Sequence, residues 1–132
     1  MSTILLIDDS RFMRLANERA LSRAGYAVIG TDDGQEGIEL ARQKRPDLIL
    51  LDMLLPKLAG TEVLRQLKSD PRTSSIPVIV LTSLSEKNKA KLVREGALDL
   101  LEKNDALLNR NSALLVEAVR KAMRGKATAA GA

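Results

Sequence analysis

Residues 48–56 constrain the fold of this chain more than any other stretch. They read Leu-Ile-Leu-Leu-Asp-Met-Leu-Leu-Pro, an apolar run that contains one carboxylate, Asp52, and is closed by Pro56. A run without polar alternation is typical of a strand buried on both faces, as in parallel sheets. Because ligands of open α/β sheets bind outside the carboxyl ends of the strands, Asp52 is a candidate site residue.

The rest of the chain alternates short apolar runs with amphipathic stretches. We predict strands over residues 4–7, 26–30, 48–52, 76–81 and 98–101, and helices over 11–24, 34–45, 61–68, 86–95 and 112–123. Gly25 and Gly96 are expected to follow helix ends, and Asp33 with Glu36 resembles a capping box. This alternation predicts an α/β fold, with a parallel sheet covered by helices on both faces. We expect one domain, residues 1–124, and a disordered tail, residues 125–132.

Composition excludes several classes of protein. The chain has no cysteine and no histidine, which excludes disulfides, thiol catalysis and Ser-His nucleophile systems. Aromatic residues make up 2% of the chain, too few for the stacking platforms of a nucleic-acid binder. No signal peptide is visible, and no apolar run approaches the roughly 20 residues that cross a bilayer. We therefore expect a cytoplasmic protein without a membrane segment.

Polar residues follow four of the predicted strands at their carboxyl ends. They are Asp8 and Asp9, Asp52, Thr82 and Ser83, and Lys103. Singly, each can be explained as a helix cap, a turn residue or a surface charge. Together, three carboxylates at one crevice repel one another unless a cation, most plausibly Mg²⁺, neutralises them. A lysine and a hydroxyl opposite them would complete a site for phosphoryl transfer, with Asp52 as the nucleophile.

Over residues 3–123 the chain resembles a response-regulator receiver domain of the stand-alone, chemotaxis-regulator type. The matching residues are Asp8-Asp9, Leu51-Asp52-Met53, Pro56, Gly60, Thr82, Gly96-Ala97 and Lys103. The resemblance implies a flavodoxin-like, doubly wound sheet of five strands in the order 2-1-3-4-5. It also implies a Mg²⁺ site made by Asp8, Asp9, Asp52 and the Leu54 carbonyl.

The resemblance implies a function in a two-component phosphorelay. Asp52 would accept a phosphoryl group from a histidine kinase or a phosphotransfer protein, Lys103 would hold a phosphoryl oxygen, and Thr82 would report the phosphate. Such a chain is not a conventional enzyme, because it catalyses only its own Mg²⁺-dependent phosphorylation and slow autodephosphorylation. Output would pass through the fourth helix, fifth strand and last helix to an unidentified protein, without direct DNA binding. The helices of this surface also allow a homodimer.

The excess of positive charge is concentrated on the part of the chain that carries this output surface. Residues 86–132 hold 10 basic and 6 acidic side chains, whereas residues 1–85 hold 11 of each. A basic surface favours an acidic docking partner.

Four positions depart from the usual receiver pattern. Leu100 stands where an aromatic residue is usual, and Asn104 stands where proline usually follows the lysine. Both departures predict an atypical readout of phosphorylation. Leu54 and Leu84 are apolar where fast-hydrolysing members carry polar groups that position water. We therefore hypothesise slow hydrolysis of the phosphorylated state.

Other readings remain open at this stage. A pseudo-receiver that docks partners without phosphorylation is compatible with Leu100 and Asn104. A phosphatase of the haloacid dehalogenase type would need Asp-x-Asp after its first strand, where this chain has Asp8-Asp9-Ser10. A flavin mononucleotide site is disfavoured because the same loop is acidic, and the glycine-rich nucleotide loop is absent.

Overall fold

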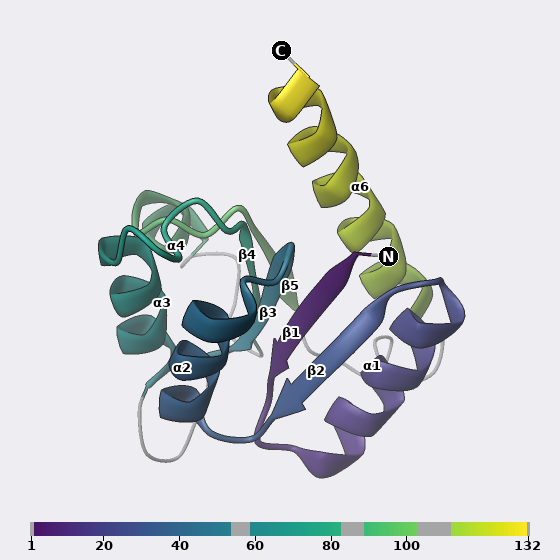
Figure 1. Cartoon of the computed structure of the whole chain (residues 1–132). Coiled ribbons are helices and arrows are strands. Elements are labelled where there is room, and N and C mark those ends of the chain that lie inside the picture. Colours follow the sequence, from purple (N-terminus) through teal and green to yellow (C-terminus); the bar gives the residue numbers. More distant parts are fainter. Residues whose placement is uncertain (1, 54–58, 83–88, 103–111, 132) are drawn as a thin grey trace.

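The computed structural model describes residues 2–53, 59–82, 89–102 and 112–131, and in this part of the chain five strands form one parallel sheet between two helical layers (Figure 1). The strands are β1 Thr3–Ile7, β2 Ala27–Thr31, β3 Leu48–Asp52, β4 Val78–Thr82 and β5 Asp99–Glu102. The helices are α1 Arg11–Arg23, α2 Gly34–Lys44, α3 Gly60–Ser69, α4 Lys89–Arg94 and α6 Ser112–Gly131. The strand order β2-β1-β3-β4-β5 confirms the predicted doubly wound fold.

The central strands are buried on both faces because their side chains alternate between two apolar clusters. In β1, Leu5 and Ile7 join the cluster that also contains side chains of α2, α3 and α4. Ile4 and Leu6 join the cluster formed with α1 and α6. All five residues of β3, Leu48–Asp52, are buried. Successive strand residues point to opposite faces, so the uninterrupted apolar run serves both clusters, as predicted.

Side-chain caps set the predicted starts of two helices. Ser10 caps α1 by accepting a hydrogen bond from the backbone N–H of Met13 at 3.3 Å. Asp33 caps α2 by accepting hydrogen bonds from two N–H groups of its first turn. In a capping box, the Glu36 side chain would accept a hydrogen bond from the backbone N–H of Asp33. That N–H donates to Thr31 Oγ1 instead, at 3.2 Å. The Asp33 cap is therefore confirmed, whereas Thr31 at the end of β2 takes the place of Glu36 in the predicted capping box.

At the helix ends, prediction and structure agree at two glycines and differ at the C-terminus. Gly25 and Gly96 have φ angles of 99° and 113°, a left-handed conformation that glycine adopts readily, and each follows a helix. The predicted end of the last helix at Met123 is wrong. In place of the disordered tail predicted for residues 125–132, α6 continues to Gly131 and stands clear of the sheet (Figure 1). The alanines beyond Gly125 have high helix propensity, which favours this continuation.

Two further expectations concern the charged helix and the membrane. The predicted start of the fourth helix at Glu86 lies outside the described residues, and the structure has α4 from Lys89. Within the described part of the chain, no helix combines the length and the hydropathy that a bilayer crossing requires.

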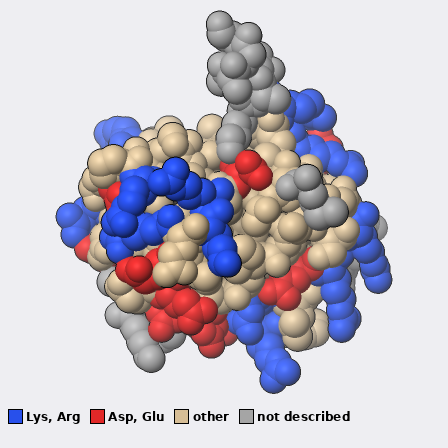
Figure 2. Space-filling model, viewed as in Figure 1, with Lys and Arg blue, Asp and Glu red and all other residues tan. Residues whose placement is uncertain are grey.

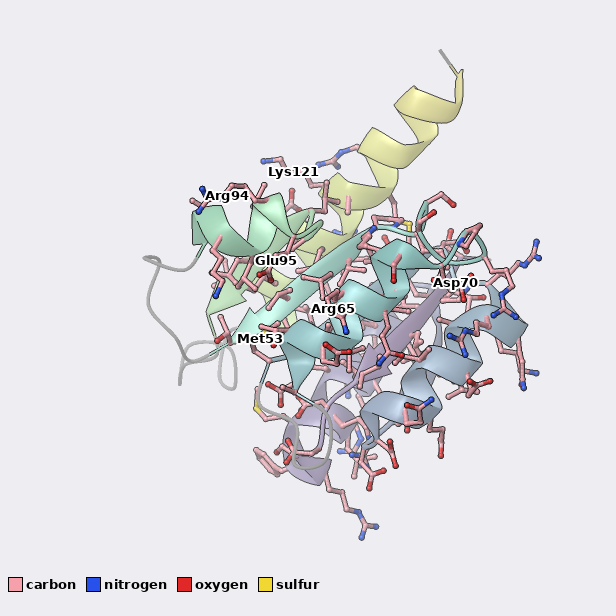
Figure 3. The ribbon with its side chains drawn as sticks, turned by 90° about the vertical axis from the view of Figure 1, so that its left-hand side faces the viewer. Met53, Arg65, Asp70, Arg94, Glu95 and Lys121 are labelled. Atoms are coloured by element: carbon pink, nitrogen blue, oxygen red, sulfur yellow. The ribbon has the colours of Figure 1, made fainter. Side chains whose placement is uncertain are left out.

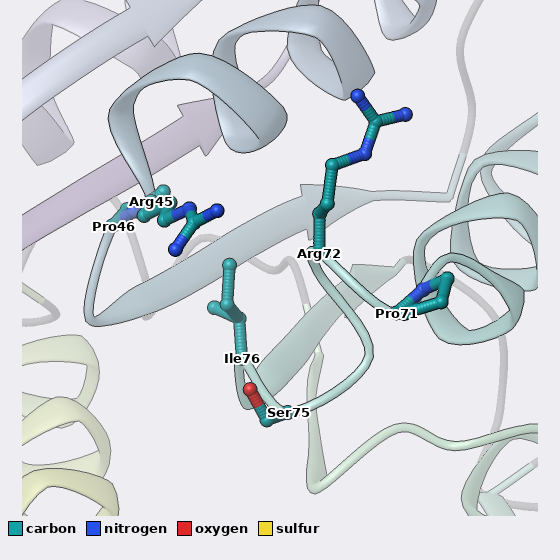
Figure 4. A pocket seen from close by; sticks show the side chains of 6 residues that line it. All are labelled: Arg45, Pro46, Pro71, Arg72, Ser75 and Ile76. Carbon is teal, nitrogen blue, oxygen red and sulfur yellow. The ribbon is translucent and has the colours of Figure 1, made fainter.

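At the edge of the sheet where the strands begin, ion pairs connect α2 to the loop before β4. Arg42 Nε of α2 and Arg72 Nη2 of the loop before β4 lie 2.9 and 3.0 Å from the same oxygen of Asp70. Beside these pairs is a hollow of about 390 Å³ (Figure 4). It is lined by Arg45, Pro46, Pro71, Arg72, Ser75 and Ile76. Arg45 is the C-cap of α2 and has a left-handed φ of 46°. This edge is thus basic and far from Asp52, which lies at the other end of β3.

Candidate functional site

The carboxyl ends of β1 and β3 bring three aspartates together. Ile7 is paired with Leu51 across these parallel strands. The next residue on each strand is at the same edge of the sheet, which places Asp8 beside Asp52. Carboxylate oxygens of Asp8, Asp9 and Asp52 all lie within 4.8 Å of one another. Asp8 and Asp52 are buried, with exposed fractions of 0% and 2%, whereas Asp9 is exposed. The three aspartates predicted as metal ligands therefore form one cluster.

Thr82 ends the neighbouring strand at the same edge. The register pairs Asp52 with Leu81, so Thr82 stands one residue beyond Asp52 on β4. Thr82 is fully buried. The structure therefore brings the predicted hydroxyl to the strand end beside the aspartate cluster. The other predicted site residues, Leu54, Ser83 and Lys103, lie outside the described residues.

The loop that carries Asp8 and Asp9 is fixed by three hydrogen bonds of Asp8, one with β2, one within the loop and one with α1. The backbone N–H of Asp8 donates to the carbonyl of Thr31 on β2 at 3.0 Å. The backbone N–H of Ser10 donates to Asp8 Oδ1 at 2.9 Å. Arg14 Nη1 donates to the carbonyl oxygen of Asp8 at 2.8 Å. Sequence reasoning missed Arg14, because a side chain that bonds a backbone carbonyl six residues earlier leaves no pattern in the sequence.

Gly60 allows the start of α3 to pack directly against the end of β3. A Cβ atom at this position would lie 2.6 Å from Met53 Cα and 2.7 Å from the carbonyl oxygen of Asp52. Both distances are far below van der Waals contact, and the atoms concerned belong to the backbone. The N–H of Gly60 donates to the Met53 carbonyl at 3.2 Å. Gly60 is one of the residues on which the family resemblance rests, and the backbone beside Asp52 leaves no space for a Cβ atom at this position.

The aspartate cluster combines like charges with burial, an unfavourable arrangement that a cation would relieve. Every candidate ligand atom is an oxygen, which suits a hard divalent cation. Ligands on opposite sides of an octahedral Mg²⁺ lie about 4.2 Å apart. Oxygens that already lie within 4.8 Å of one another need only small movements to reach that geometry. The residues present therefore fit a divalent metal ion.

Comparison with known proteins identifies the class to which this fold and site belong. The family model of the response regulator receiver domain matches residues 4–111. The chain therefore belongs to the receiver domain family of two-component response regulators.

Among named relatives, the protein PilH of Pseudomonas aeruginosa is 39% identical over 104 residues, which are 78% of this chain and 86% of PilH. The polar-differentiation response regulator DivK of Brucella anthropi is 35% identical, over 71% of this chain and 76% of DivK. Among solved structures, the chemotaxis response regulator CheY4 of Vibrio cholerae matches with a TM-score of 0.83 and 27% identity, over 92% of this chain and 98% of CheY4. These likenesses confirm the resemblance inferred from the strand ends.

Proposed function

We propose that this receiver accepts a phosphoryl group on Asp52 from a histidine kinase or a phosphotransfer protein, in a Mg²⁺-dependent reaction. The observation that carries the proposal is the convergence of Asp8, Asp9 and Asp52, whose carboxylate oxygens lie within 4.8 Å at the ends of β1 and β3. A carboxylate can act as a nucleophile towards phosphorus when a cation neutralises the negative charges of the carboxylate and of the phosphoryl oxygens. Membership of the receiver family supports the same role.

Asp8, Asp9 and Asp52 would hold the Mg²⁺, with the carbonyl of Leu54 as a further ligand. When bound, the ion neutralises the carboxylates and the incoming phosphoryl oxygens. The response regulator Rcp1, which has 28% sequence identity to this chain and a TM-score of 0.78 over 89% of this chain and 91% of Rcp1, is known in a Mn²⁺-bound form. This relative supports a divalent cation in the present cluster.

The side chains of this receiver would divide the work of phosphoryl transfer. A carboxylate oxygen of Asp52 forms the new O–P bond while the P–N bond to the donor histidine breaks, and the electrons of that bond return to the imidazole. The hydroxyls of Thr82 and Ser83 would donate to phosphoryl oxygens, and Lys103 would neutralise another oxygen. Hydrolysis of the acyl phosphate by water later restores Asp52. The protein thus acts on itself and is not a conventional enzyme.

Exposed apolar side chains support two contact surfaces. Among the described residues, the large apolar side chains that are most exposed lie on α1 or on the predicted output surface. On α1, Phe12 is 71% exposed and follows the acidic loop directly, so it offers a contact to the phosphodonor protein. Val93 of α4, Leu98 before β5 and Leu114 of α6 are 46%, 52% and 58% exposed. These three side chains support output, or dimerisation, through α4, β5 and α6.

Leu100, one of the departures from the family pattern on the output side, is partly buried. Leu100 packs against the apolar cluster shared with α2, α3 and α4. An aliphatic side chain there lacks the flat ring whose rotation would follow Thr82. We therefore propose that phosphorylation changes the surface of α4 and β5 through a movement other than the rotation of an aromatic ring.

The test is the intact mass of the protein after incubation with acetyl phosphate and Mg²⁺. We expect one added phosphoryl group in the wild type and none in Asp52→Asn or in a sample treated with a chelator. Asp47→Asn, which changes an aspartate at the opposite end of β3, is the matched control and is expected to be phosphorylated like the wild type. No addition to the wild type would contradict the proposal and favour the pseudo-receiver reading.

A further inference from the structure

The Arg14 side chain of α1 reaches back to the acidic loop. Its Nη1 donates to the carbonyl oxygen of Asp8 at 2.8 Å, in a partly buried position. That carbonyl belongs to the peptide group that joins Asp8 to Asp9. The orientation of this peptide sets the direction in which the Asp9 side chain leaves the backbone.

The position of the Asp9 carboxylate depends on this peptide group more than the positions of the Asp8 and Asp52 carboxylates do. Asp8 and Asp52 are buried, and Asp8 Oδ1 also accepts a hydrogen bond from Ser10. Asp9 is exposed, and within the described residues its carboxylate makes no hydrogen bond or ion pair. Its distance from the other two carboxylates is therefore set mainly by the backbone of the loop.

Gly30 on the edge strand β2 makes room for the Arg14 side chain. A Cβ atom on Gly30 would lie 3.3 Å from Arg14 Cδ and 1.9 Å from Glu18 Oε1. Gly30 does not have a positive φ, so the backbone conformation does not require glycine. Glycine weakens the interior of a strand unless something approaches closely. Here the close approach comes from the two α1 side chains that lie over the strand.

We propose that Arg14, passing over Gly30, is a positioning residue that holds the Asp8–Asp9 peptide so that the Asp9 carboxylate joins the metal site. This inference rests on the proposed Mg²⁺-binding function. It makes a prediction opposite to that of simple electrostatics. A cationic guanidinium near a cation site should repel the metal, so removal of the charge alone would tighten binding. Removal of a positioning contact weakens binding instead.

The experiment is a calorimetric titration of the whole chain with Mn²⁺, with thermal unfolding of each metal-free variant measured in parallel. We expect Arg14→Ala to bind Mn²⁺ about tenfold more weakly, at the lower end of the loss found when partners of metal ligands are removed. Arg14→Lys, which keeps a donor of similar reach, should recover part of the affinity. Arg19→Ala changes an exposed arginine of the same helix and should leave the affinity unchanged.

A second variant tests the same contact by a change on β2. Gly30→Val adds a side chain that suits a strand. Its Cβ would overlap Glu18 Oε1 and lie 3.3 Å from Arg14 Cδ, so the added side chain would displace Glu18 and press on Arg14. We expect weaker Mn²⁺ binding without loss of thermal stability, and no further loss when Arg14→Ala is added, because both changes break one contact.

Unchanged or tighter Mn²⁺ binding by a folded Arg14→Ala or Gly30→Val protein would overturn the inference while leaving the proposed function intact. Absence of Mn²⁺ binding by the wild type would overturn the metal site itself, and this inference with it.

Discussion

At the edge where the strands end, three carboxylates lie within 4.8 Å of one another, whereas at the edge where the strands begin, Arg42 and Arg72 both pair with Asp70. Figure 3 shows the two edges at opposite ends of α3, with Met53, the neighbour of Asp52, at one end and Asp70 at the other. Figure 2 shows one face of the molecule, where basic side chains form an arc and acidic side chains gather below it.

The two edges have different roles: the charges at one edge stabilise the fold, and the charges at the other edge form the site. Pairing of opposite charges across α2 and the loop before β4 is explained by the stability of the folded chain. Convergence of like charges, two of them buried, opposes folding and is explained by a ligand that the charges bind. The edge with the unfavourable electrostatics is therefore the functional edge.

The largest predicted effect is a difference in the sign of two matched substitutions. In metal-free buffer, Asp52→Asn should increase the free energy of unfolding by roughly 1–4 kcal/mol, because it removes like-charge repulsion at this separation. Asp70→Asn should decrease it, because it removes the partner of two arginines. Chemical denaturation of both variants at neutral pH measures the two changes. A loss of stability in both variants would contradict the contrast between the edges.

Saturating Mg²⁺ should change the effect of one of these two substitutions only. The ion binds the folded wild type and stabilises it by mass action, so the advantage of Asp52→Asn should shrink or reverse, while the effect of Asp70→Asn should not change. The same denaturation series with and without Mg²⁺ provides the measurement, and Ca²⁺-free buffer with chelator provides the control.

A substitution beside Asp52 should have the next largest effect. Gly60→Ala places a methyl group against the backbone of Asp52 and Met53, and we expect it to cost about 1–3 kcal/mol of stability, as overpacking does, and to slow phosphorylation. Gly125→Ala is the control, since a Cβ there meets nothing within 4 Å. Wild-type stability and phosphorylation in Gly60→Ala would show that the start of α3 does not fix the site.

The edge with paired charges should respond to acid in a defined direction. The side chain and backbone N–H of Arg72, together with Arg42, hold the pKa of Asp70 well below its usual range. The stability that this pairing supplies is therefore fully present above the unfolded pKa of about 4 and is lost as the pH falls towards the lowered folded value. The difference in stability between wild type and Asp70→Asn should shrink below about pH 4. A difference that grew on acidification would contradict the pairing.

The smallest predicted effect concerns the lifetime of the phosphorylated state. Leu54 lies outside the described residues, and its role remains a hypothesis from the sequence. We expect Leu54→Asn to speed the loss of the phosphoryl group several-fold by placing an amide where it can position water, with Leu54→Ile as control. Intact-mass time courses after removal of acetyl phosphate measure both rates, and equal rates would defeat the hypothesis.

The sequence predicted the parts of this molecule that depend on local pattern. The apolar run at residues 48–51 is typical of a strand with two buried faces. Parallel strands bring their carboxyl ends to one edge, so Asp8 and Asp52 could be placed together. Arg14 and Gly30 could not be predicted, because their contact joins a helix to an edge strand through side-chain geometry. The end of α6 was missed because small residues were read as a disordered tail, although alanine favours helix.

The role of the aspartate edge is best tested by a ¹H–¹⁵N correlation spectrum recorded before and after addition of Mg²⁺ and then of beryllofluoride, a mimic of the phosphoryl group. We expect the amide signals of Asp8, Asp9, Asp52 and Thr82 to shift, while those of Arg45 and Arg72 at the opposite edge stay in place. Unchanged signals at the strand ends, or shifts centred on the hollow beside Arg45, would contradict this role of the aspartate edge.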